Sequence, residues 1–386
     1  MRILHTIEGM GIRYGGIATC TYELLTAIQG KRHTVEMLTP TLKNPQDKLL
    51  GKGEIWMRTF SNDGLGPMNF SWNVRRELKH GCYDLYHVNG MWQHICHATA
   101  RYARKSGKPY VVTPHGMLYP TALKISYWKK WPMLKFWFAE DIQKASGFHA
   151  TCETEMSHLR ELGYAGPVAV IGNPVKVPEY VAELVENRKR HYVQHPEIRL
   201  GFLGRLHPIK RIENLLRGVA QSSVRDLQVV LLGDGDVEYR KFLMEETLRL
   251  GINERVEFLG FVSGREKFEQ LSRLSALFVP SDMENFGMIV PEALLAGTPV
   301  MASLGTPWQS LNDYGCGWWV DNSPQSIAGV IEDIAGKSPL ELFTMGLKGR
   351  EMVLNKFEAS IVARKMLQFY SWLLGESDRP NFVYES

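Results

Sequence analysis

The sequence predicts an α/β protein made of two tandem doubly wound, Rossmann-like domains with a cleft between them. Three observations support this fold class. The chain has 386 residues, which is too long for one typical hydrophobic core. Apolar runs with strand periodicity alternate with runs of helical periodicity, as in βαβ units. Two such series are separated by a short segment containing two prolines, residues 172–178.

The first series fills residues 2–174. Short apolar runs bounded by turn residues predict strands, and amphipathic runs such as 17–29 and 93–106 predict helices between them. The predicted strands are 2–7, 34–40, 54–60, 83–89, 110–115, 147–152 and 168–171. We therefore assign residues 1–173 to the first domain.

The second series starts near Ile198 and repeats the same alternation. Its predicted strands are 198–203, 228–232, 256–259, 276–279 and 299–302. We assign residues 178–357 to the second domain. The amphipathic run that follows, residues 358–374, predicts a terminal helix.

Composition excludes several classes of protein. With 44% hydrophobic and 22% charged residues the chain is ordinary for a soluble globular protein, and no apolar run approaches the length of a membrane span. The five cysteines lack any C-x-x-C pair, which argues against a zinc site or disulfides and for reduced thiols in a cytoplasm. Residues 1–172 hold 21 Lys and Arg against 13 Asp and Glu, so the first half favours an anionic partner, a membrane or a nucleic acid.

The most informative stretch is residues 276–297, where a strand-like run leads through a tight loop into a helix. Glu284 falls at the carboxyl end of the strand, and Glu292 lies in the first turn of the helix. In an open α/β sheet this edge binds ligands, and a helix N-terminus favours phosphate. Glu292 could equally complement the helix dipole without any ligand.

Two carboxylates beside a phosphate site suit a nucleotide sugar, because one can accept hydrogen bonds from a ribose and the other from a sugar. Main-chain N–H groups of the intervening loop can hold the diphosphate between them. The candidate donor-binding residues of this loop are Asn285, Phe286, Gly287 and Met288.

Two cations are expected at the carboxyl end of the first strand in the second series. Gly204 and Arg205 end that strand, and Lys210 comes just before the next helix. Together the two cations form a candidate diphosphate clamp. Phe261 and Val262 follow another strand of the series and could supply main-chain contacts to a nucleobase.

In the first domain, residues 8–16 form a glycine-rich loop in which Gly15 and Gly16 allow a ligand to approach the backbone closely. Tyr14 occupies the third glycine position of the dinucleotide fingerprint, which disfavours an NAD enzyme. His115 ends another strand and is expected to face the cleft, as a donor to a sugar hydroxyl or a diphosphate oxygen. A lone histidine of this kind can also be purely structural.

Residues 124–138 hold four lysines, three tryptophans and no acid. Tryptophan suits the membrane–water interface and lysine suits anionic headgroups, although aromatic residues at helical spacing also fill cores. Single-stranded nucleic acid uses similar residue types. Pro132 predicts a break between two short helices. The candidate membrane contacts are Lys124, Trp128, Lys129, Lys130, Trp131 and Lys135.

In their order and spacing these motifs resemble the retaining glycosyltransferases of sequence family 4, which have the two-Rossmann GT-B fold. The resemblance covers nearly the whole chain. Its matching elements are Gly15-Gly16, His115-Gly116, Gly204-Arg205 with Lys210, Gly233-Asp234-Gly235, Phe258-Leu259-Gly260 and the E-x7-E motif from Glu284 to Glu292. The chain departs from the family pattern at Asn173-Pro174 between the domains and at residues 30–33.

The resemblance implies a role for each principal candidate. Arg205 and Lys210 would neutralise the departing diphosphate, and Glu292 would hold the ribose. Glu284 would contact the transferred sugar, with His115 close to that sugar. It also implies that residues 1–173 bind the acceptor, that residues 178–357 bind the nucleotide sugar, and that the helix 358–374 packs back on the first domain.

The implied reaction moves a hexose-type sugar from a UDP- or GDP-linked donor to a glycan or lipid-linked acceptor in surface polysaccharide synthesis. We expect no metal or other cofactor, because two cationic side chains can replace it and no Asp-x-Asp motif is present. We expect a cytoplasmic protein that attaches to the inner face of the plasma membrane, and no nucleic-acid partner. The alternatives are a nucleotide-sugar epimerase, a glucan or glycoside synthase with a soluble acceptor, and a basic nucleic-acid-binding module.

Overall fold

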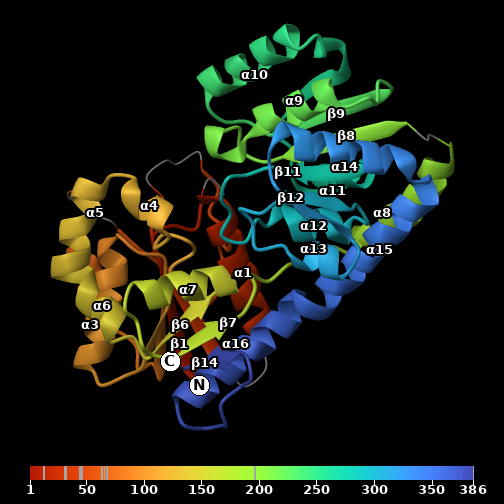
Figure 1. The fold of residues 1–386 in the computed structure, drawn as a ribbon. Coiled ribbons are helices and arrows are strands. Elements are labelled where there is room, and N and C mark those ends of the chain that lie inside the picture. Colours follow the sequence, from red (N-terminus) through yellow and green to blue (C-terminus); the bar gives the residue numbers. More distant parts are fainter. Residues whose placement is uncertain are drawn as a thin grey trace. The chain divides into compact units, whose positions relative to one another are not determined.

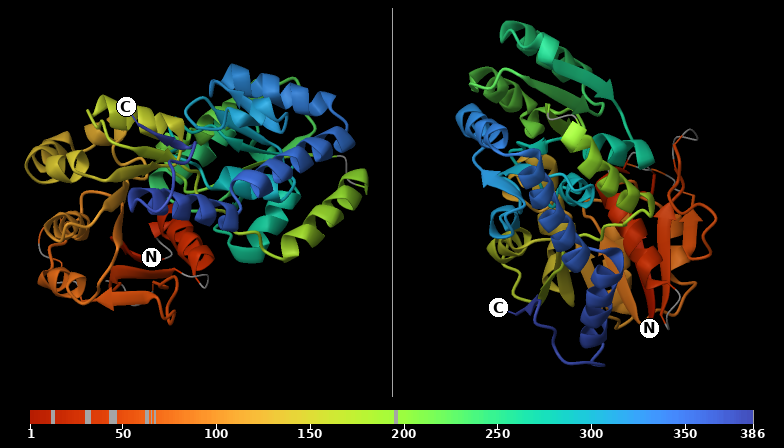
Figure 2. Two further views of the ribbon diagram at one scale, coloured as in Figure 1. Left: turned by 90° about the horizontal axis from the view of Figure 1, so that it is seen from below. Right: turned by 90° about the vertical axis from the view of Figure 1, so that its right-hand side faces the viewer.

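The computed structural model describes residues 1–11, 14–29, 33–42, 47–61, 64, 66, 68–194 and 197–385. The chain divides into two compact units, unit 1 (Met1–Pro174 with Ala359–Ser386) and unit 2 (Val175–Glu358). Each unit is built on one sheet flanked by helices (Figures 1 and 2). The prediction of two Rossmann-like domains with parallel sheets is therefore confirmed.

The sheet of unit 1 has eight strands in the order β14-β7-β6-β5-β4-β1-β2-β3, and all its pairs are parallel except β7–β14. Its strands are β1 (Arg2–Ile7), β2 (Thr34–Pro40), β3 (Met57–Phe60), β4 (Leu85–Asn89), β5 (Tyr110–Thr113), β6 (Gly147–Ala150), β7 (Val168–Val170) and β14 (Val383–Tyr384). The order reverses between β1 and β4, which makes their carboxyl ends the topological switch point of the sheet.

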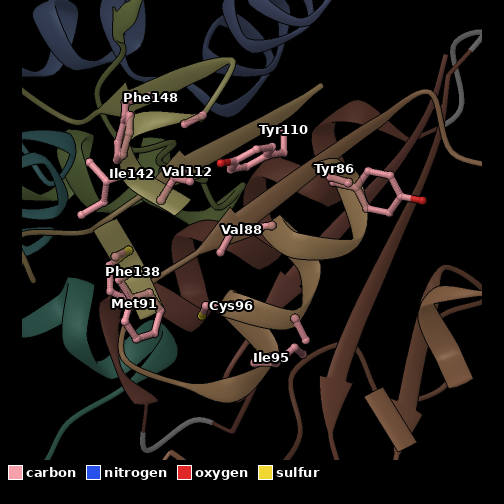
Figure 3. Packing of buried hydrophobic residues seen from close by; sticks show 14 of the residues in the cluster. Tyr86, Val88, Met91, Ile95, Cys96, Tyr110, Val112, Phe138, Ile142 and Phe148 are labelled. Carbon is pink, nitrogen blue, oxygen red and sulfur yellow. The ribbon is translucent and has the colours of Figure 1, made fainter. Parts of the chain in front are cut away.

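Helices cover both faces of this sheet. They are α1 (Gly16–Ile28), α2 (Trp72–Leu78), α3 (His94–Lys105), α4 (Pro120–Lys124), α5 (Tyr127–Met133), the π-helix η2 (Leu134–Phe138), α6 (Ala139–Gln143), α7 (Glu153–Glu161) and α16 (Ala359–Leu373). On one face Leu25 of α1 and Phe369 of α16 pack against Ile3. On the other face Ile95 and Cys96 of α3 join the core around Val88 (Figure 3).

Unit 2 has six parallel strands in the order β10-β9-β8-β11-β12-β13. They are β8 (Ile198–Leu203), β9 (Leu227–Leu232), β10 (Val256–Gly260), β11 (Ala276–Val279), β12 (Val300–Ser303) and β13 (Gly317–Val320). The helices are α8 (Tyr180–Gln194), η3 (Pro208–Lys210), α9 (Ile212–Gln221), α10 (Val237–Arg249), η4 (Asn253–Arg255), α11 (Gly264–Ser272), α12 (Ile289–Leu295), α13 (Ser310–Asp313), α14 (Pro324–Gly336) and α15 (Pro339–Lys356). Here the switch point lies between β8 and β11.

The structure differs from the sequence prediction in three places. The strands β13 and β14 were not predicted, because both are short edge strands with little periodicity to read. The predicted break at Pro132 is wrong: α5 contains Pro132 and runs directly into the π-helix η2. A proline removes one main-chain hydrogen bond, and a local π-turn shifts the hydrogen-bond register of the helix around that missing bond.

In the described part of the chain, no helix is long and apolar enough to cross a membrane.

A chain of buried hydrogen bonds crosses the face of the unit 1 sheet that α16 covers. The hydroxyl of Tyr370 lies 2.5 Å from His87 Nδ1 and 3.2 Å from His5 Nε2. The hydroxyl of Thr113 lies 2.6 Å from His87 Nε2 and 2.9 Å from His149 Nδ1. These side chains come from α16 and from four strands, so the hydrogen bonds tie α16 to the sheet.

The direction of every hydrogen bond in this series follows from the one at its end, between His149 and Ile171. His149 Nε2 lies 2.7 Å from the carbonyl oxygen of Ile171, which can only accept, so Nε2 carries the proton and Nδ1 accepts from Thr113. Thr113 then accepts from His87, and Tyr370 donates to His87 and accepts from His5. All three histidines are neutral in this arrangement, and burial lowers the pKa of His5 to about 3 and that of His149 to about 4.

We expect unit 1 to lose stability on mild acidification. A histidine that remains neutral in the folded state but has a pKa of 6.5 in the unfolded chain stabilises the fold above pH 6.5. This contribution is lost as the pH falls from 6.5 toward 4, because the unfolded chain then binds protons that the folded chain cannot. At pH 5 the loss is about 2 kcal/mol for each such histidine. Calorimetry from pH 7.5 to 5 measures it as a falling melting temperature.

The variant Tyr370→Phe provides the control at pH 8, where protonation plays no part. It leaves His87 Nδ1 and His5 Nε2 without their partner and should cost about 1–3 kcal/mol. A melting temperature that stays constant between pH 7.5 and 5 would show that the histidines accept protons without unfolding.

Candidate active site

The candidate site of unit 2 lies at the carboxyl edge of its sheet, at the switch point between β8 and β11. Lys210 ends the turn η3 after β8, and Glu284 lies in the loop after β11. Their side chains form an ion pair and are only 21% and 13% exposed. The structure therefore brings together two residues that lie far apart in the sequence and that the sequence predicts for one site.

The carboxylate of Glu284 is fixed at one of its two oxygens. Its Oε1 accepts from Lys210 and, at 2.8 Å, from the hydroxyl of Ser281, which is fully buried. No residue within the described ranges donates to its Oε2. That oxygen can therefore accept a hydrogen bond from a ligand.

The loops that carry Lys210 and Glu284 are also bonded to each other. The N–H of Asp282 donates to the carbonyl of Ile209 at 2.9 Å, and Arg211 Nε donates to Asp282 Oδ2 at 2.6 Å. Arg211 has φ 49°, a left-handed conformation that costs a non-glycine residue roughly 1–2 kcal/mol. Arg211 thus positions its neighbour Lys210, a role that its sequence context did not indicate.

Glu292, the second acid of the E-x7-E motif, is paired with a different lysine. Lys267 in α11 donates to Glu292 Oε1 at 2.7 Å, with side-chain exposures of 21% and 17%. Sequence analysis missed Lys267, because a lysine in a first helical turn carries no sign of a partner on another helix. Each acid of the motif therefore has its own lysine.

The loop between the two acids leaves donors unused. Phe286 is buried against Trp308, whose indole N–H donates to the carbonyl of Phe286, and this contact anchors the loop. Gly287 has φ 72°, which its lack of a side chain permits. In the described structure the N–H groups of Phe286, Gly287 and Met288 have no acceptor, and Asn285 lies half-buried beside them.

The remaining donor candidates of unit 2 lie at the same edge. Arg205 is exposed and forms no ion pair with any residue that the structure describes. It follows Gly204, against which Gly233 packs so closely that a Cβ on Gly233 would lie 2.0 Å from the carbonyl oxygen of Gly204. Phe261 is exposed, whereas the side chain of Val262 is buried.

Unit 1 places its candidates at the carboxyl ends of β1 and β5. Gly15 has φ 66°, and a Cβ there would meet no atom within 4 Å, so the loop that holds Gly15 and Gly16 borders open space. His115 has φ 51° and lies in a turn that buried Glu155 holds, since Glu155 Oε1 accepts from the N–H of Gly116 at 2.5 Å.

The imidazole of His115 has an unused nitrogen. Its Nε2 is buried and has no hydrogen-bond partner among the residues described. Burial lowers the pKa of His115 to about 3, so the ring is neutral at physiological pH. A neutral imidazole nitrogen can donate to or accept from a ligand hydroxyl.

Two residues at this edge escaped the sequence analysis. Glu8 directly follows β1; burial raises its pKa, and no described side chain or main-chain group bonds to it. Trp92 follows β4 with φ 69°, and its buried indole N–H also lacks an acceptor in the described structure. A buried polar atom without a partner costs free energy, so Trp92 indicates a place for a ligand, and half-buried Glu8 lies at the same edge.

The basic and aromatic segment is exposed over much of its length. Trp128 is 87% and Trp131 47% exposed, and Lys124 is exposed as well. Lys135 is exposed, with its ammonium 5.1 Å from the centre of the Trp131 ring. Phe136 is 70% exposed and was not among the predicted contacts.

Two lysines of this segment differ from the others. Lys130 turns inward, since its ammonium donates to the carbonyl of Ala122 at 2.6 Å and lies 5.6 Å from the centre of the Trp92 ring. Burial lowers its pKa. The ammonium of Lys130 is therefore engaged within the protein and is not available for contact with a membrane surface. The side chain of Lys129 lies outside the described part of the structure.

The described residues contain no cluster of three or more His, Cys, Asp or Glu side chains that could hold a metal ion.

Comparison with solved structures assigns the fold to the GT-B class. HepE of Anabaena in complex with UDP superposes with a TM-score of 0.74 at 21% identity, over 96% of this chain and all of the other. The lipopolysaccharide outer core galactosyltransferase WaaB superposes with a TM-score of 0.70 at 19% identity, with 96% and 100% coverage. At these identities the likeness establishes the fold alone.

The sequence comparisons then identify the family. Residues 14–177 match the model described as Glycosyltransferase Family 4, and residues 185–341 match the model described as Glycosyl transferases group 1. With most of both units matched, the chain belongs to the family-4 type of glycosyltransferases, which confirms the resemblance of the motifs.

Curated relatives differ in how much of their length is matched. The 2-deoxystreptamine glucosyltransferase of Streptomyces kanamyceticus is 26% identical over 363 residues, 87% of each chain. An uncharacterised glycosyltransferase of Methanocaldococcus jannaschii is 29% identical over 49% of this chain and 48% of its own. A D-inositol 3-phosphate glycosyltransferase of Corynebacterium diphtheriae is 36% identical over 27% and 26%. The chain thus spans half or less of the length of the latter two relatives.

Proposed function

We propose that this protein transfers a hexose-type sugar, with retained configuration, from a nucleotide diphosphate to a glycan or lipid-linked acceptor in surface polysaccharide synthesis. The observation that carries the proposal is the placement of the two lysine–glutamate pairs beside unused main-chain donors at the switch point of unit 2. Membership of the glycosyltransferase family supports it. HepE was crystallised with UDP and with UDP-glucose, which supports a nucleotide-sugar donor here as well.

In this proposal the donor lies along the carboxyl edge of unit 2. Lys210 and Arg205 hold the diphosphate, together with the free N–H groups of residues 286–288. The unused oxygen of Glu284 accepts from a hydroxyl of the transferred sugar, and Glu292 accepts from the ribose. Residues 261–262 lie beside the base. Because two cations offset the phosphate charge, we expect no metal ion to be needed.

The chemical step separates charge. The bond between the anomeric carbon and the diphosphate oxygen breaks, and the electron pair leaves with the diphosphate. The acceptor oxygen attacks the same face of the sugar and passes its proton to the departing phosphate oxygen. Preorganised positive charge stabilises the departing group, which is expected to be the largest catalytic contribution.

We expect Lys210→Ala to lower kcat by about 100- to 1,000-fold, the usual effect of losing one preorganised contact to developing charge. A thermal-shift panel of UDP, GDP and ADP sugars selects the donor, and turnover is then measured with it. Lys210→Arg keeps the charge and should retain more activity than the alanine variant. Near wild-type turnover of Lys210→Ala would contradict the assignment of Lys210 to the diphosphate clamp.

Glu292→Gln should instead weaken nucleotide binding, measured by calorimetry.

We place the acceptor at the carboxyl edge of unit 1. Glu8 offers a hydrogen-bond acceptor, Trp92 offers a donor, and His115 offers either. Adjacent strands are about 4.8 Å apart, so the ends of β1, β4 and β5 span about 10 Å, the size of one or two sugar rings. The unpartnered groups would then find partners in acceptor hydroxyls.

We expect Glu8→Gln to raise the KM for the acceptor about tenfold, since a hydrogen bond to a charged group contributes about 1.5 kcal/mol or more. The KM for the donor should not change. The melting temperature should hold or rise, because the substitution removes a half-buried charge that has no partner among the described residues. An unchanged acceptor KM would exclude Glu8 from the acceptor site, and a fall in stability without a kinetic effect would make its role structural.

A second candidate function is a glycoside synthase with a soluble, amino-bearing acceptor. The carboxylate of Glu8, which has no partner among the residues that the structure describes, favours it, because such a group binds an ammonium ion well. The name of the 2-deoxystreptamine glucosyltransferase, the relative matched over 87% of its length, points the same way. Turnover on aminocyclitols without membranes would distinguish this function from transfer to a lipid-linked acceptor.

We further propose that the exposed aromatic surface, Trp128, Trp131 and Phe136, contacts the inner face of the plasma membrane. Burying one tryptophan in the interface is worth roughly tenfold in affinity or more. We therefore expect Trp128→Ser to weaken sedimentation with phosphatidylglycerol vesicles by about that factor. Trp72→Ser is the matched control, since Trp72 on α2 of the same unit is 63% exposed. Equal effects of both substitutions would contradict the proposal.

A further inference from the structure

A basic pocket lies at the amino edge of the unit 1 sheet, opposite the edge that holds the candidate site. Its volume is about 600 Å³, and it forms where α3 and α6 end and where β5 and β6 begin. Its charged lining residues are Arg101, Arg104, Lys105, Lys108, Lys144 and a single acid, Glu140. Neither the donor site nor the acceptor site uses any of them.

The cations come largely from one face of α3 and its extension. Arg104 and Lys105 lie three and four residues after Arg101, which places the three side by side on α3, and Lys108 follows just beyond the end of that helix. Like charges four residues apart repel each other. The helix dipole favours cations in the last turn, but Lys108 lies beyond the end of α3. The dipole therefore accounts for Arg104 and Lys105, but not for Arg101 and Lys108.

The pocket contains one cation that its neighbours hold in place and three exposed cations that are not held by ion pairs within the described residues. Arg104 is 14% exposed and is held by Asp141 Oδ1 at 2.6 Å, by Glu140 Oε2 at 3.5 Å and by the hydroxyl of Tyr110 at 3.1 Å. By contrast Arg101, Lys105 and Lys108 are exposed and form no ion pair within the described residues. Three uncompensated cations beside a preorganised guanidinium form an anion site of the kind that phosphate groups occupy.

We propose that this pocket binds a phosphate ester, in an anionic lipid headgroup or in a soluble molecule. The donor diphosphate is not its ligand, because the donor site lies at the carboxyl edge of the other unit. The surroundings favour the lipid source. Glu140 and Lys144 of the pocket lie four and eight residues after exposed Phe136, in one continuous helical run, and α3, α5 and α6 are neighbours in unit 1 (Figure 1). A headgroup held here would complement aromatic side chains inserted nearby.

The test compares two triple variants that remove the same charge. The pocket variant is Arg101→Gln, Lys105→Gln and Lys108→Gln, all at exposed positions, and it leaves Arg104 intact. The control variant is Arg225→Gln, Arg240→Gln and Lys348→Gln, at exposed positions of unit 2. One arm measures sedimentation with vesicles of phosphatidylglycerol in phosphatidylcholine. The other arm measures NMR shifts on titration with glycerol 3-phosphate and inorganic phosphate.

We expect the pocket variant to lose about fivefold in vesicle affinity per cation, roughly 100-fold in total, and the control variant to lose much less. This result identifies a lipid headgroup. Binding of glycerol 3-phosphate that only the pocket variant loses, with vesicle binding unchanged, identifies a soluble phosphate ester. Equal losses in both variants, or no phosphate binding in either arm, would overturn the proposal. Turnover with a soluble acceptor reports on glycosyl transfer separately.

Discussion

The reversal of strand order in each parallel sheet determines where the candidate site residues lie. At the reversal, the connections after two neighbouring strands leave toward opposite faces, which opens a crevice at their carboxyl ends. In unit 2 the reversal separates β8 from β11 and receives Lys210 and Glu284. In unit 1 it separates β1 from β4 and receives Glu8 and Trp92. The same topology therefore produces a polar crevice twice, with different side chains.

The two crevices differ in how their charge is balanced. In the crevice of unit 2, Glu284 and Glu292 are each paired with a lysine, so these ion pairs remain satisfied without a ligand. A partly buried ion pair costs desolvation that its own attraction only partly offsets, and phosphates and hydroxyls can exchange with such partners at small net cost. Glu8 in unit 1 has no such partner within the described chain, and burial raises its pKa, so a ligand that donates hydrogen bonds can compensate its carboxylate. This asymmetry fits a donor that brings negative charge and an acceptor that brings hydroxyl or amino groups.

Much of the fold and part of the site could be predicted from the sequence. Strand periodicity located the buried strands, and a strand–loop–helix pattern was enough to place Glu284, Glu292 and Lys210 at one edge. Lys267 and Arg211 could not be found in this way, because their partners lie on other elements and no local pattern marks such pairs. The continuation of the helix past Pro132 was also unpredictable, since it depends on a π-turn that a sequence does not reveal.

Residues with strained backbone conformations lie at the same carboxyl edges of the sheets as the charged candidate residues. Among the residues that the structure describes, five non-glycine residues have positive φ, and three of them, Trp92, His115 and Arg211, follow the carboxyl ends of strands. Such conformations persist only where surrounding contacts impose them. Glu155 bonds to the turn of His115, and Asp282 bonds to Arg211, so acids of neighbouring elements impose two of them. The geometry of both crevices is thus set by each unit's own packing before any substrate arrives, as electrostatic preorganisation requires.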